Sequence, residues 1–438
     1  MEIWGVGVLN TRTILMVLSL ALVTACGKDV SAAMGPAAEA AQAPPAPPSF
    51  DQGFLDRLDA ELQGPVQNGK YRNIAYALLK DGQRVHTGFL GPHNEANSQT
   101  VNDRTIYRIY SMTKPVTAVA LMKLHEDGKF QLDDPVTDYL PELAKLEVLQ
   151  RIDANGSPVT APPARMPTIR ELLTHTAGFG YGAGRPDYVN ARLDAEGVLN
   201  KASPGEMIRA LAKVPLAYEP GTGWQYSIAS DVQGALIERL SGQPLSAFLE
   251  AEIFGPLDMQ DTGFWVEEAD RARLAPLTAW APDTGRTTVD GPIAAMARAG
   301  LPYEAGGHGL VSTLADYERF LLMLMNEGEL DGVRILTPET VRLITANALS
   351  PPPEDMSAKP VGPGYGLGFG FGVATVEDYM LAGLNAPDGT YYWEGAAGTW
   401  FWVDPENKII FIGLVQNLSP HVTSLRKPSM LAVYRALN

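Results

Sequence analysis

Two pairs of strand-like segments lie far apart in the sequence. Residues 73–89 contain two apolar runs that are separated by Asp81-Gly82, a dipeptide that favours a tight hairpin turn. Near the other end, residues 399–404 and 409–417 form a second pair, joined by turn-forming residues 405–408. The pattern predicts antiparallel strands at both ends of the folded part of the chain.

Between these strands, the apolar positions mostly follow the spacing of helices. Residues 231–242 place apolar side chains on one helical face and end in Gly242, which is a stop signal. The tail from Pro428 predicts a closing helix. An antiparallel sheet built from both chain ends, flanked by helices and interrupted by a mainly helical insert, is an α+β arrangement.

A glycine-rich stretch over residues 364–373 alternates glycine with Tyr365, Leu367, Phe369 and Phe371. In a strand, this alternation places the glycines on one face, usually because another backbone approaches closely. The dinucleotide-binding pattern G-x-G-x-x-G does not occur in the chain. We therefore expect a close-packed strand here and no cofactor.

The composition is that of a globular protein with a sizeable core, with 45% hydrophobic and 19% charged residues. Acidic residues exceed basic ones by 50 to 34, which gives a formal charge of −16, and no stripe of Lys or Arg is present. These features argue against a nucleic-acid partner.

The first 25 residues have the character of an export signal. Their apolar run, residues 14–25, is shorter than the roughly 20 residues that a membrane-spanning helix needs. Residues 23–26 resemble a bacterial lipobox, in which the cysteine becomes the lipidated N-terminus after cleavage. Cys26 is the only cysteine in the chain, so no disulfide can form within it, and lipidation is expected. The alternative is an incidental cysteine beside an ordinary signal cleavage site.

The following residues, up to position 48, are rich in Ala and Pro and poor in large apolar side chains, which is typical of an extended tether. We therefore expect a signal peptide over residues 1–25, a tether over residues 26–48 and one folded domain over residues 49–438. The expected location is the periplasm, with the lipid anchored in a bacterial membrane.

A Ser-x-x-Lys motif spans residues 111–114, between a strand-like run and an apolar segment that predicts a buried helix ending near Asp127-Gly128. At this spacing on a helix, the Ser111 hydroxyl and the Lys114 amine share one face and can exchange a proton. The helix N-terminus favours negative charge on the serine oxygen. A lysine with a pKa of about 10.4 is a poor base at neutral pH, so burial must lower the pKa of Lys114.

The motif alone is weakly specific, because a second copy spans residues 424–427. No comparable strand and helix surround Ser424, which we expect to be a loop or capping residue. A serine nucleophile also needs a proton carrier for the leaving group, and Tyr226, after the turn-forming Pro220-Gly221, is a candidate. Taken alone, Tyr226 is better explained as a core or hairpin tyrosine than as a catalytic residue.

Six stretches spread over residues 60–435 resemble the serine β-lactamase-related superfamily (class C β-lactamase and penicillin-binding-protein fold), most closely the family VIII esterases. They occur in the family's order, at residues 107–115, 132–141, 172–182, 226–227, 306–320 and 391–405. The resemblance implies a β-lactamase/transpeptidase-like fold and a serine hydrolase that needs no cofactor.

Carried over by position, the resemblance implies that Ser111 is the acylated nucleophile, Lys114 its base and Tyr226 the residue that relays protons to and from the leaving group. Residues 393–395 match the strand motif that is Lys-Thr-Gly in class C β-lactamases and Trp-Gly-Gly or similar in the esterases. The backbone amides of Ser111 and Ala396 are then the implied oxyanion hole.

Two departures from the family pattern concern the substrate. Ile228 replaces the asparagine that would hold an acylamino group, and Trp393 replaces the lysine that would meet the carboxylate of a β-lactam or peptide. Ile228, Trp393 and Gly395 are therefore expected substrate-binding residues that favour a neutral ester with an apolar acyl part. Glu394 replaces a small residue, and either points into the site or is a solvated strand residue.

The sequence gives no indication of metal or α/β-hydrolase chemistry. His175 and His308 fall in matching stretches but outside the family's catalytic set, so we expect both to be structural. The chain lacks His-Glu-x-x-His and any paired cysteine, and it lacks Gly-x-Ser-x-Gly.

The leading interpretation is a carboxylesterase for small or short-chain esters that acts through an acyl-enzyme on Ser111. One alternative is a β-lactamase, D-alanyl carboxypeptidase or amidase acting on cell-wall-derived substrates. Another is a non-catalytic envelope lipoprotein that binds a ligand or partner. The presence of Ser111, Lys114 and Tyr226 together favours an enzyme.

Overall fold

The structure of the protein is a computed structural model. The described residues are 50–94, 99–182, 185, 187–291, 297, 303–349 and 362–437. The expected signal peptide, Cys26 and the tether over residues 26–48 lie outside them. Among the helices of the described part, none combines the length and the apolar character needed to cross a membrane.

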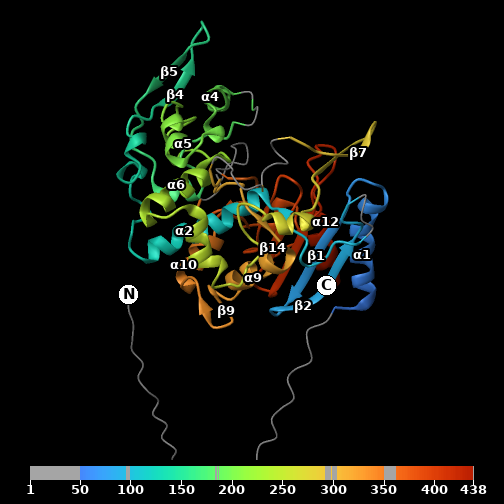
Figure 1. Ribbon diagram of the computed structural model, residues 1–438. Helices are drawn as coiled ribbons and strands as arrows, with labels where there is room; N and C mark the ends of the chain where they lie inside the picture. The colour runs from blue at the N-terminus through green and yellow to red at the C-terminus, as the bar shows by residue number, and fades with distance from the viewer. Residues whose placement is uncertain are drawn as a thin grey trace, which may run out of the picture. The chain divides into compact units, whose positions relative to one another are not determined.

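A seven-stranded antiparallel sheet brings the two ends of the folded chain together (Figure 1), in the strand order β11-β12-β13-β14-β15-β1-β2. The strands are β1 (Ile74–Lys80), β2 (Gln83–Leu90), β11 (Leu367–Phe369), β12 (Ala374–Val376), β13 (Tyr391–Glu394), β14 (Trp400–Asp404) and β15 (Ile409–Leu414). β1 pairs with β15, with Ala75 opposite Leu414. The predicted α+β arrangement is confirmed.

The sheet separates two hydrophobic cores, because alternate side chains of a strand point to opposite faces. In β14, Trp400 and Trp402 pack into the core formed with α1 (Gln52–Gln67) and α12 (Arg426–Leu437). Phe401 and Val403 pack into the larger core on the other side. All residues of β14 are buried, which explains its uninterrupted apolar sequence.

The larger core contains the helices that carry the candidate site. They are α2 (Thr113–Glu126), α6 (Ala229–Ser241) and α9 (Leu314–Met325). α2 is buried along most of its length, as its apolar sequence predicts. α6 ends at Gly242, whose φ of 72° permits the left-handed turn after the helix.

The rest of the described chain is mainly helical, with short two-stranded sheets. The helices are α3 (Ile169–Leu173), α4 (Tyr188–Glu196), α5 (Pro204–Leu211), α7 (Leu245–Leu249), α10 (Pro338–Thr345) and α11 (Tyr379–Ala382). The paired strands are β3 (Tyr107–Arg108) with β8 (Val311–Ser312), β4 (Val148–Ile152) with β5 (Pro158–Ala161), β6 (Thr278–Ala281) with β7 (Gly285–Thr288), and β9 (Glu329–Leu330) with β10 (Val333–Arg334).

Local sequence signals located the turns better than the element ends. Asp81 and Gly82 both have positive φ, at 51° and 75°, as a two-residue hairpin turn requires, and they connect β1 to β2. The closing helix α12 begins at Arg426 and not at Pro428, because proline is tolerated in the first turn of a helix.

The single strand predicted over residues 364–373 is wrong. The chain forms the short strand β11, turns through Gly372 at a φ of 81°, and returns as β12. The predicted close approach of another backbone is confirmed at Gly370, where an added Cβ would lie 2.1 Å from the Ile344 carbonyl oxygen. The alternating glycines therefore serve a turn as well as close packing.

Candidate active site

Ser111 lies in a tight turn between β3 and α2. Residues 110–112 form one turn of 3-10 helix and α2 begins at Thr113, so Ser111 lies two residues before the α-helix that the sequence predicted it would open. Tyr110 has a φ of 44°, a left-handed conformation that is uncommon for a residue other than glycine. The Met112 carbonyl accepts a hydrogen bond of 2.9 Å from the Tyr317 hydroxyl of α9. The buried Tyr317 side chain thus holds the turn in place.

Lys114 lies on the first turn of α2 and is fully buried. Its Nζ atom lies 3.4 Å from Ser111 Oγ and donates a hydrogen bond of 2.6 Å to the Gly307 carbonyl. Nζ also lies 4.6 Å from the centre of the Tyr226 ring. Burial lowers the pKa of Lys114, and the nearby Tyr181 and Asp231 partly oppose that shift. The direction is the one that a lysine base requires.

Tyr226 reaches Ser111 from 115 positions away in the chain, through a hydrogen bond of 2.7 Å from its hydroxyl to Ser111 Oγ. Its ring stacks on Tyr181 with 5.2 Å between ring centres. Burial raises the pKa of Tyr226, while its hydrogen bond with Ser111 lowers it. Tyr226 is therefore a neutral phenol at neutral pH, able to donate a proton.

The end of β13 runs alongside the Ser111 turn. A Cβ added to Gly395 would lie 2.4 Å from the Ile109 carbonyl oxygen and 2.2 Å from Thr399 Oγ1, so only glycine fits. Gly395 N donates to the Thr399 carbonyl at 2.8 Å, and Ala396 is exposed in the turn that follows. The backbone at the end of β13 thus lies next to the Ser111 turn, as the resemblance implies. The role of the Ser111 and Ala396 amides as an oxyanion hole stays a prediction.

Trp393 and Ile228 occupy different environments. Trp393 is partly exposed, and its ring centre lies 5.5 Å from that of Tyr226 and 5.3 Å from that of Phe369. Ile228 is fully buried in the larger core, and its backbone N–H donates to the Gly180 carbonyl. Of these two predicted substrate-binding residues, Trp393 is partly exposed beside Tyr226, and Ile228 is buried in the larger core.

Glu394 is bound to the start of α12. Its carboxylate accepts a hydrogen bond from the Ser424 hydroxyl and lies 3.4 Å from the Arg426 guanidinium. Ser424 also accepts a hydrogen bond from the Arg426 backbone N–H, so it has the turn role expected for it. The partly exposed Glu394 of β13 thus forms an ion pair with Arg426 of α12. The sequence interpretations, which placed it either in the site or in solvent, did not include this pair.

His175 is a buried neighbour of Tyr226. Its Nδ1 atom lies 2.9 Å from Ser227 Oγ, and its ring centre lies 5.0 Å from that of Tyr226. Burial and the positive charge of Lys114 lower the pKa of His175 well below its usual value, so the imidazole is neutral. In the part of the chain that the structure describes, no group of three or more His, Cys, Asp or Glu residues is placed to hold a metal ion.

Two residues of the site were not singled out from the sequence. Tyr181 stacks on Tyr226, and its backbone N–H donates to Asn190 Oδ1 at 2.7 Å. Asp231 on the first turn of α6 is 2% exposed and contributes to the pKa of Lys114. Neither carries a local pattern that would separate it from an ordinary core tyrosine or a helix-start carboxylate.

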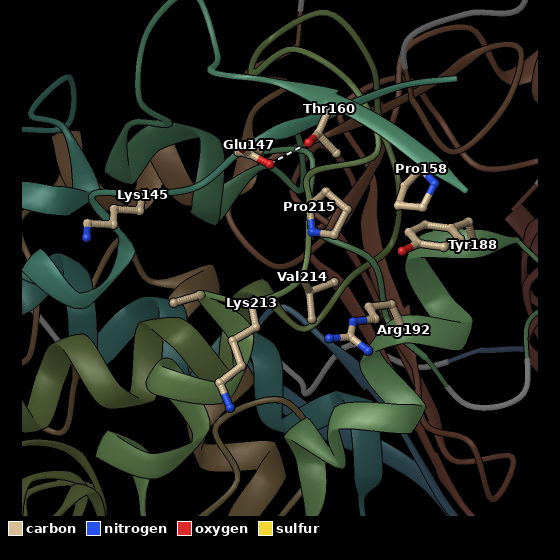
Figure 2. A pocket seen from close by; sticks show the side chains of 10 residues that line it. Lys145, Glu147, Pro158, Thr160, Tyr188, Arg192, Lys213, Val214 and Pro215 are labelled. Carbon is tan, nitrogen blue, oxygen red and sulfur yellow. Dashed lines mark hydrogen bonds between the residues drawn. The ribbon is translucent and has the colours of Figure 1, made fainter. Parts of the chain in front are cut away.

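A pocket of about 500 Å³ lies elsewhere, between the β4–β5 hairpin, α4 and the end of α5 (Figure 2). Its basic side chains include Arg192 and Lys213, and both pair with Glu196. It shares no lining residue with the Ser111 group, so it is separate from the candidate active site.

Comparisons with known proteins agree with the geometry. The model of the family described as beta-lactamase matches residues 58–433. An uncharacterized protein of Mycobacterium tuberculosis is 37% identical over 326 residues, which cover 72% of this chain and 78% of that protein. Esterase EstB of Burkholderia gladioli is 32% identical over 368 residues, 80% of this chain and 86% of the esterase.

Among solved structures, EstCE1, described as a hydrolase with promiscuous acyltransferase activity, is similar with a TM-score of 0.74 and 26% identity, over 88% of this chain and 98% of that chain. The fold predicted from the resemblance is thereby confirmed. The chain belongs to the beta-lactamase family and is a serine hydrolase with the serine β-lactamase/transpeptidase fold.

Proposed function

We propose that the protein is a carboxylesterase for small or short-chain esters that forms and hydrolyses an acyl-enzyme on Ser111. The observation that carries the proposal is the position of Ser111 Oγ, which lies 2.7 Å from the Tyr226 hydroxyl and 3.4 Å from the buried amine of Lys114. A nucleophile within reach of two groups whose pKa values are shifted in opposite directions is an arrangement suited to acyl transfer.

In the proposed acylation step, neutral Lys114 takes the Ser111 proton while Oγ attacks the ester carbonyl carbon. The carbonyl oxygen gains negative charge, and the Ser111 and Ala396 amides stabilise it. When the tetrahedral adduct collapses, the bond to the alcohol oxygen breaks and Tyr226 donates its proton to the departing alkoxide. Water then attacks the acyl carbon and gives a proton to the Tyr226 phenolate. The bond from the acyl carbon to Ser111 Oγ breaks, the Lys114 ammonium returns a proton to Oγ, and the carboxylic acid is released.

The side chains around Ser111 support a neutral, apolar acyl group. Tyr226 bonds to Ser111, and its aromatic ring contacts those of Tyr181 and Trp393. Trp393 occupies the position at which related β-lactamases carry a lysine, so that cation is replaced by an apolar ring. The nearby Arg185 donates a hydrogen bond of 3.2 Å to the Tyr226 carbonyl oxygen, so its guanidinium already has a protein partner. Relatives described as an esterase and as a hydrolase support the same class of substrate.

We also propose that the enzyme is exported and held at a bacterial membrane by a lipid on Cys26. The support is the apolar run before this single cysteine and the Pro- and Ala-rich residues after it. Expression of the full chain in a bacterium with an alkyne-bearing fatty acid should label the wild-type protein and leave Cys26→Ala unlabelled. Equal labelling of both proteins would refute lipidation at Cys26.

The substrate proposal is tested by comparing two chromogenic substrates, p-nitrophenyl butyrate and a chromogenic cephalosporin, with wild type and Ser111→Ala. We expect rapid ester turnover that disappears in the variant, together with little turnover of the cephalosporin. A preference for the cephalosporin would show that Trp393 does not exclude β-lactams. Absence of turnover and of fluorophosphonate labelling at Ser111 would favour a binding role.

A further inference from the structure

Residues 303–310 form a segment that contacts Lys114 in addition to Ser111. Lys114 Nζ donates to the Gly307 carbonyl at 2.6 Å, and Thr117, one turn further along α2, donates to the Gly306 carbonyl at 2.7 Å. Two successive carbonyl groups are therefore bound by one face of α2. The glycine-rich sequence at 306–307 is thus part of the support for the lysine.

The other side of this segment is held by α6. Asp231 Oδ1 accepts a hydrogen bond of 3.2 Å from Gly307 N. An added Cβ at Gly307 would lie 2.5 Å from Asp231 Oδ2, and one at Gly306 would lie 2.6 Å from the Ser230 carbonyl oxygen. The segment can pass between the two helices only because both positions are glycine.

Asp231 is an unusual residue for a core position. It is 2% exposed, and the Tyr303 side chain lies against it. His308 Nδ1 lies 3.7 Å from Asp231 Oδ1, and burial lowers the pKa of His308, so the imidazole is neutral. A buried carboxylate is costly unless an opposite charge interacts with it, and the buried Lys114 is a basic group on which its charge acts.

The titratable groups that face Lys114 leave Asp231 as the carboxylate that acts on it. Tyr226 and Tyr181 have raised pKa values and are neutral phenols, and His175 and His308 have lowered pKa values and are neutral imidazoles. Tyr303 lies against Asp231, and burial and that carboxylate raise its pKa. The charge of Asp231 raises the pKa of Lys114 against the larger lowering effect of burial.

We propose that Asp231 is a positioning residue: through Gly307 it holds the carbonyl group that binds Lys114, and its buried charge governs how readily Lys114 gives up its proton. The inference rests on the proposed function, in which Lys114 is the base for Ser111. It gives the carboxylate on α6 a part in catalysis although the carboxylate touches neither the nucleophile nor the substrate.

The test is the pH dependence of kcat/KM for p-nitrophenyl butyrate, which reports groups of the free enzyme. Turnover should rise with pH as Lys114 becomes neutral. Asp231→Asn keeps an acceptor for Gly307 N–H and removes the charge, so the pKa of Lys114 should fall. The rise of kcat/KM on the acidic side of the pH profile (the acidic limb) should then move to lower pH by on the order of one unit. Asp231→Glu keeps the charge on a displaced group, so its limb should stay in place while its plateau falls.

Asp316→Asn is the matched control. Asp316 is also a buried carboxylate, accepting hydrogen bonds from Thr262 Oγ1 at 2.9 Å and from Asp261 N at 2.8 Å, but it does not contribute to the pKa of Lys114. Its removal should lower the melting temperature without moving the acidic limb. Circular dichroism of every variant identifies any loss of folding.

The outcomes separate the two proposals. An active wild type whose acidic limb is unmoved in a folded Asp231→Asn would overturn the role of Asp231 and leave the esterase intact. If Asp231→Asn does not fold, Asp231→Glu provides the test. An acidic limb that moves while the kcat/KM plateau stays at the wild-type value would overturn the inference. A wild type without ester turnover and without phosphonate labelling of Ser111 would instead refute the proposed function.

Discussion

Replacement of Tyr226 by phenylalanine is the sharpest perturbation of the proposed proton path. The variant keeps the ring that stacks on Tyr181 at 5.2 Å and lies 4.6 Å from Lys114 Nζ, and it loses the hydroxyl that bonds to Ser111 Oγ at 2.7 Å. A positioned proton donor contributes about 10²–10⁴-fold to rate, which corresponds to about 2.7–5.5 kcal/mol of activation free energy. We expect kcat for ethyl butyrate, whose ethoxide leaving group needs a proton, to fall by that factor.

The free energy of unfolding should change much less, by about 1 kcal/mol, because one buried hydrogen bond is lost and the packing is kept. Tyr434→Phe is the control, since this buried tyrosine donates to Asp404 Oδ2 at 2.6 Å within the other core. It should lower stability and leave kcat unchanged. A Tyr226→Phe enzyme with wild-type kcat would refute the assignment of Tyr226 as proton carrier.

Three further predictions concern groups around the nucleophile. Lys114→Met should reduce ester turnover, measured by initial rates, by about 10³-fold, because the base is lost. Circular dichroism should show a folded protein, because methionine fills the same buried space without charge. Near-normal turnover would contradict a lysine base. Gly395→Ala should reduce turnover by about 10²-fold, since its Cβ would meet the Ile109 carbonyl oxygen at 2.4 Å and displace the end of β13, and slower fluorophosphonate labelling should accompany the loss. Ser424→Ala should keep full turnover and full labelling, because this hydroxyl binds Glu394 at the start of α12; a large loss would mean that the second Ser-x-x-Lys copy takes part.

The sheet could be predicted because its signals are local. The turn at Asp81-Gly82 and the uninterrupted apolar run of β14 reflect turn geometry and burial on both faces. The glycine-rich segment misled the prediction, because alternating residues indicate a strand but do not reveal that Gly372 turns the chain by adopting a positive φ. Whether a glycine serves close packing or a turn depends on contacts that are distant in sequence.

The candidate site was only partly predictable for the same reason. The Ser111–Lys114 pair is local, since two residues that are three positions apart lie on adjacent turns of a helix and stay close. The Tyr226–Ser111 hydrogen bond joins positions 115 apart, and only resemblance to a family pointed to it. Glu394 could not be placed, because its partner Arg426 comes from the far end of the chain.

Trapping the intermediate tests the central claim most directly. The full-length protein would be mixed rapidly with p-nitrophenyl butyrate, quenched in acid during the first turnover, and digested for peptide mass spectrometry. We predict one butyryl group on the peptide that contains Ser111, assigned to the serine oxygen by fragmentation, and none in Ser111→Ala. A turning-over enzyme that carries no acyl group at Ser111, or carries it at another residue, would contradict the account.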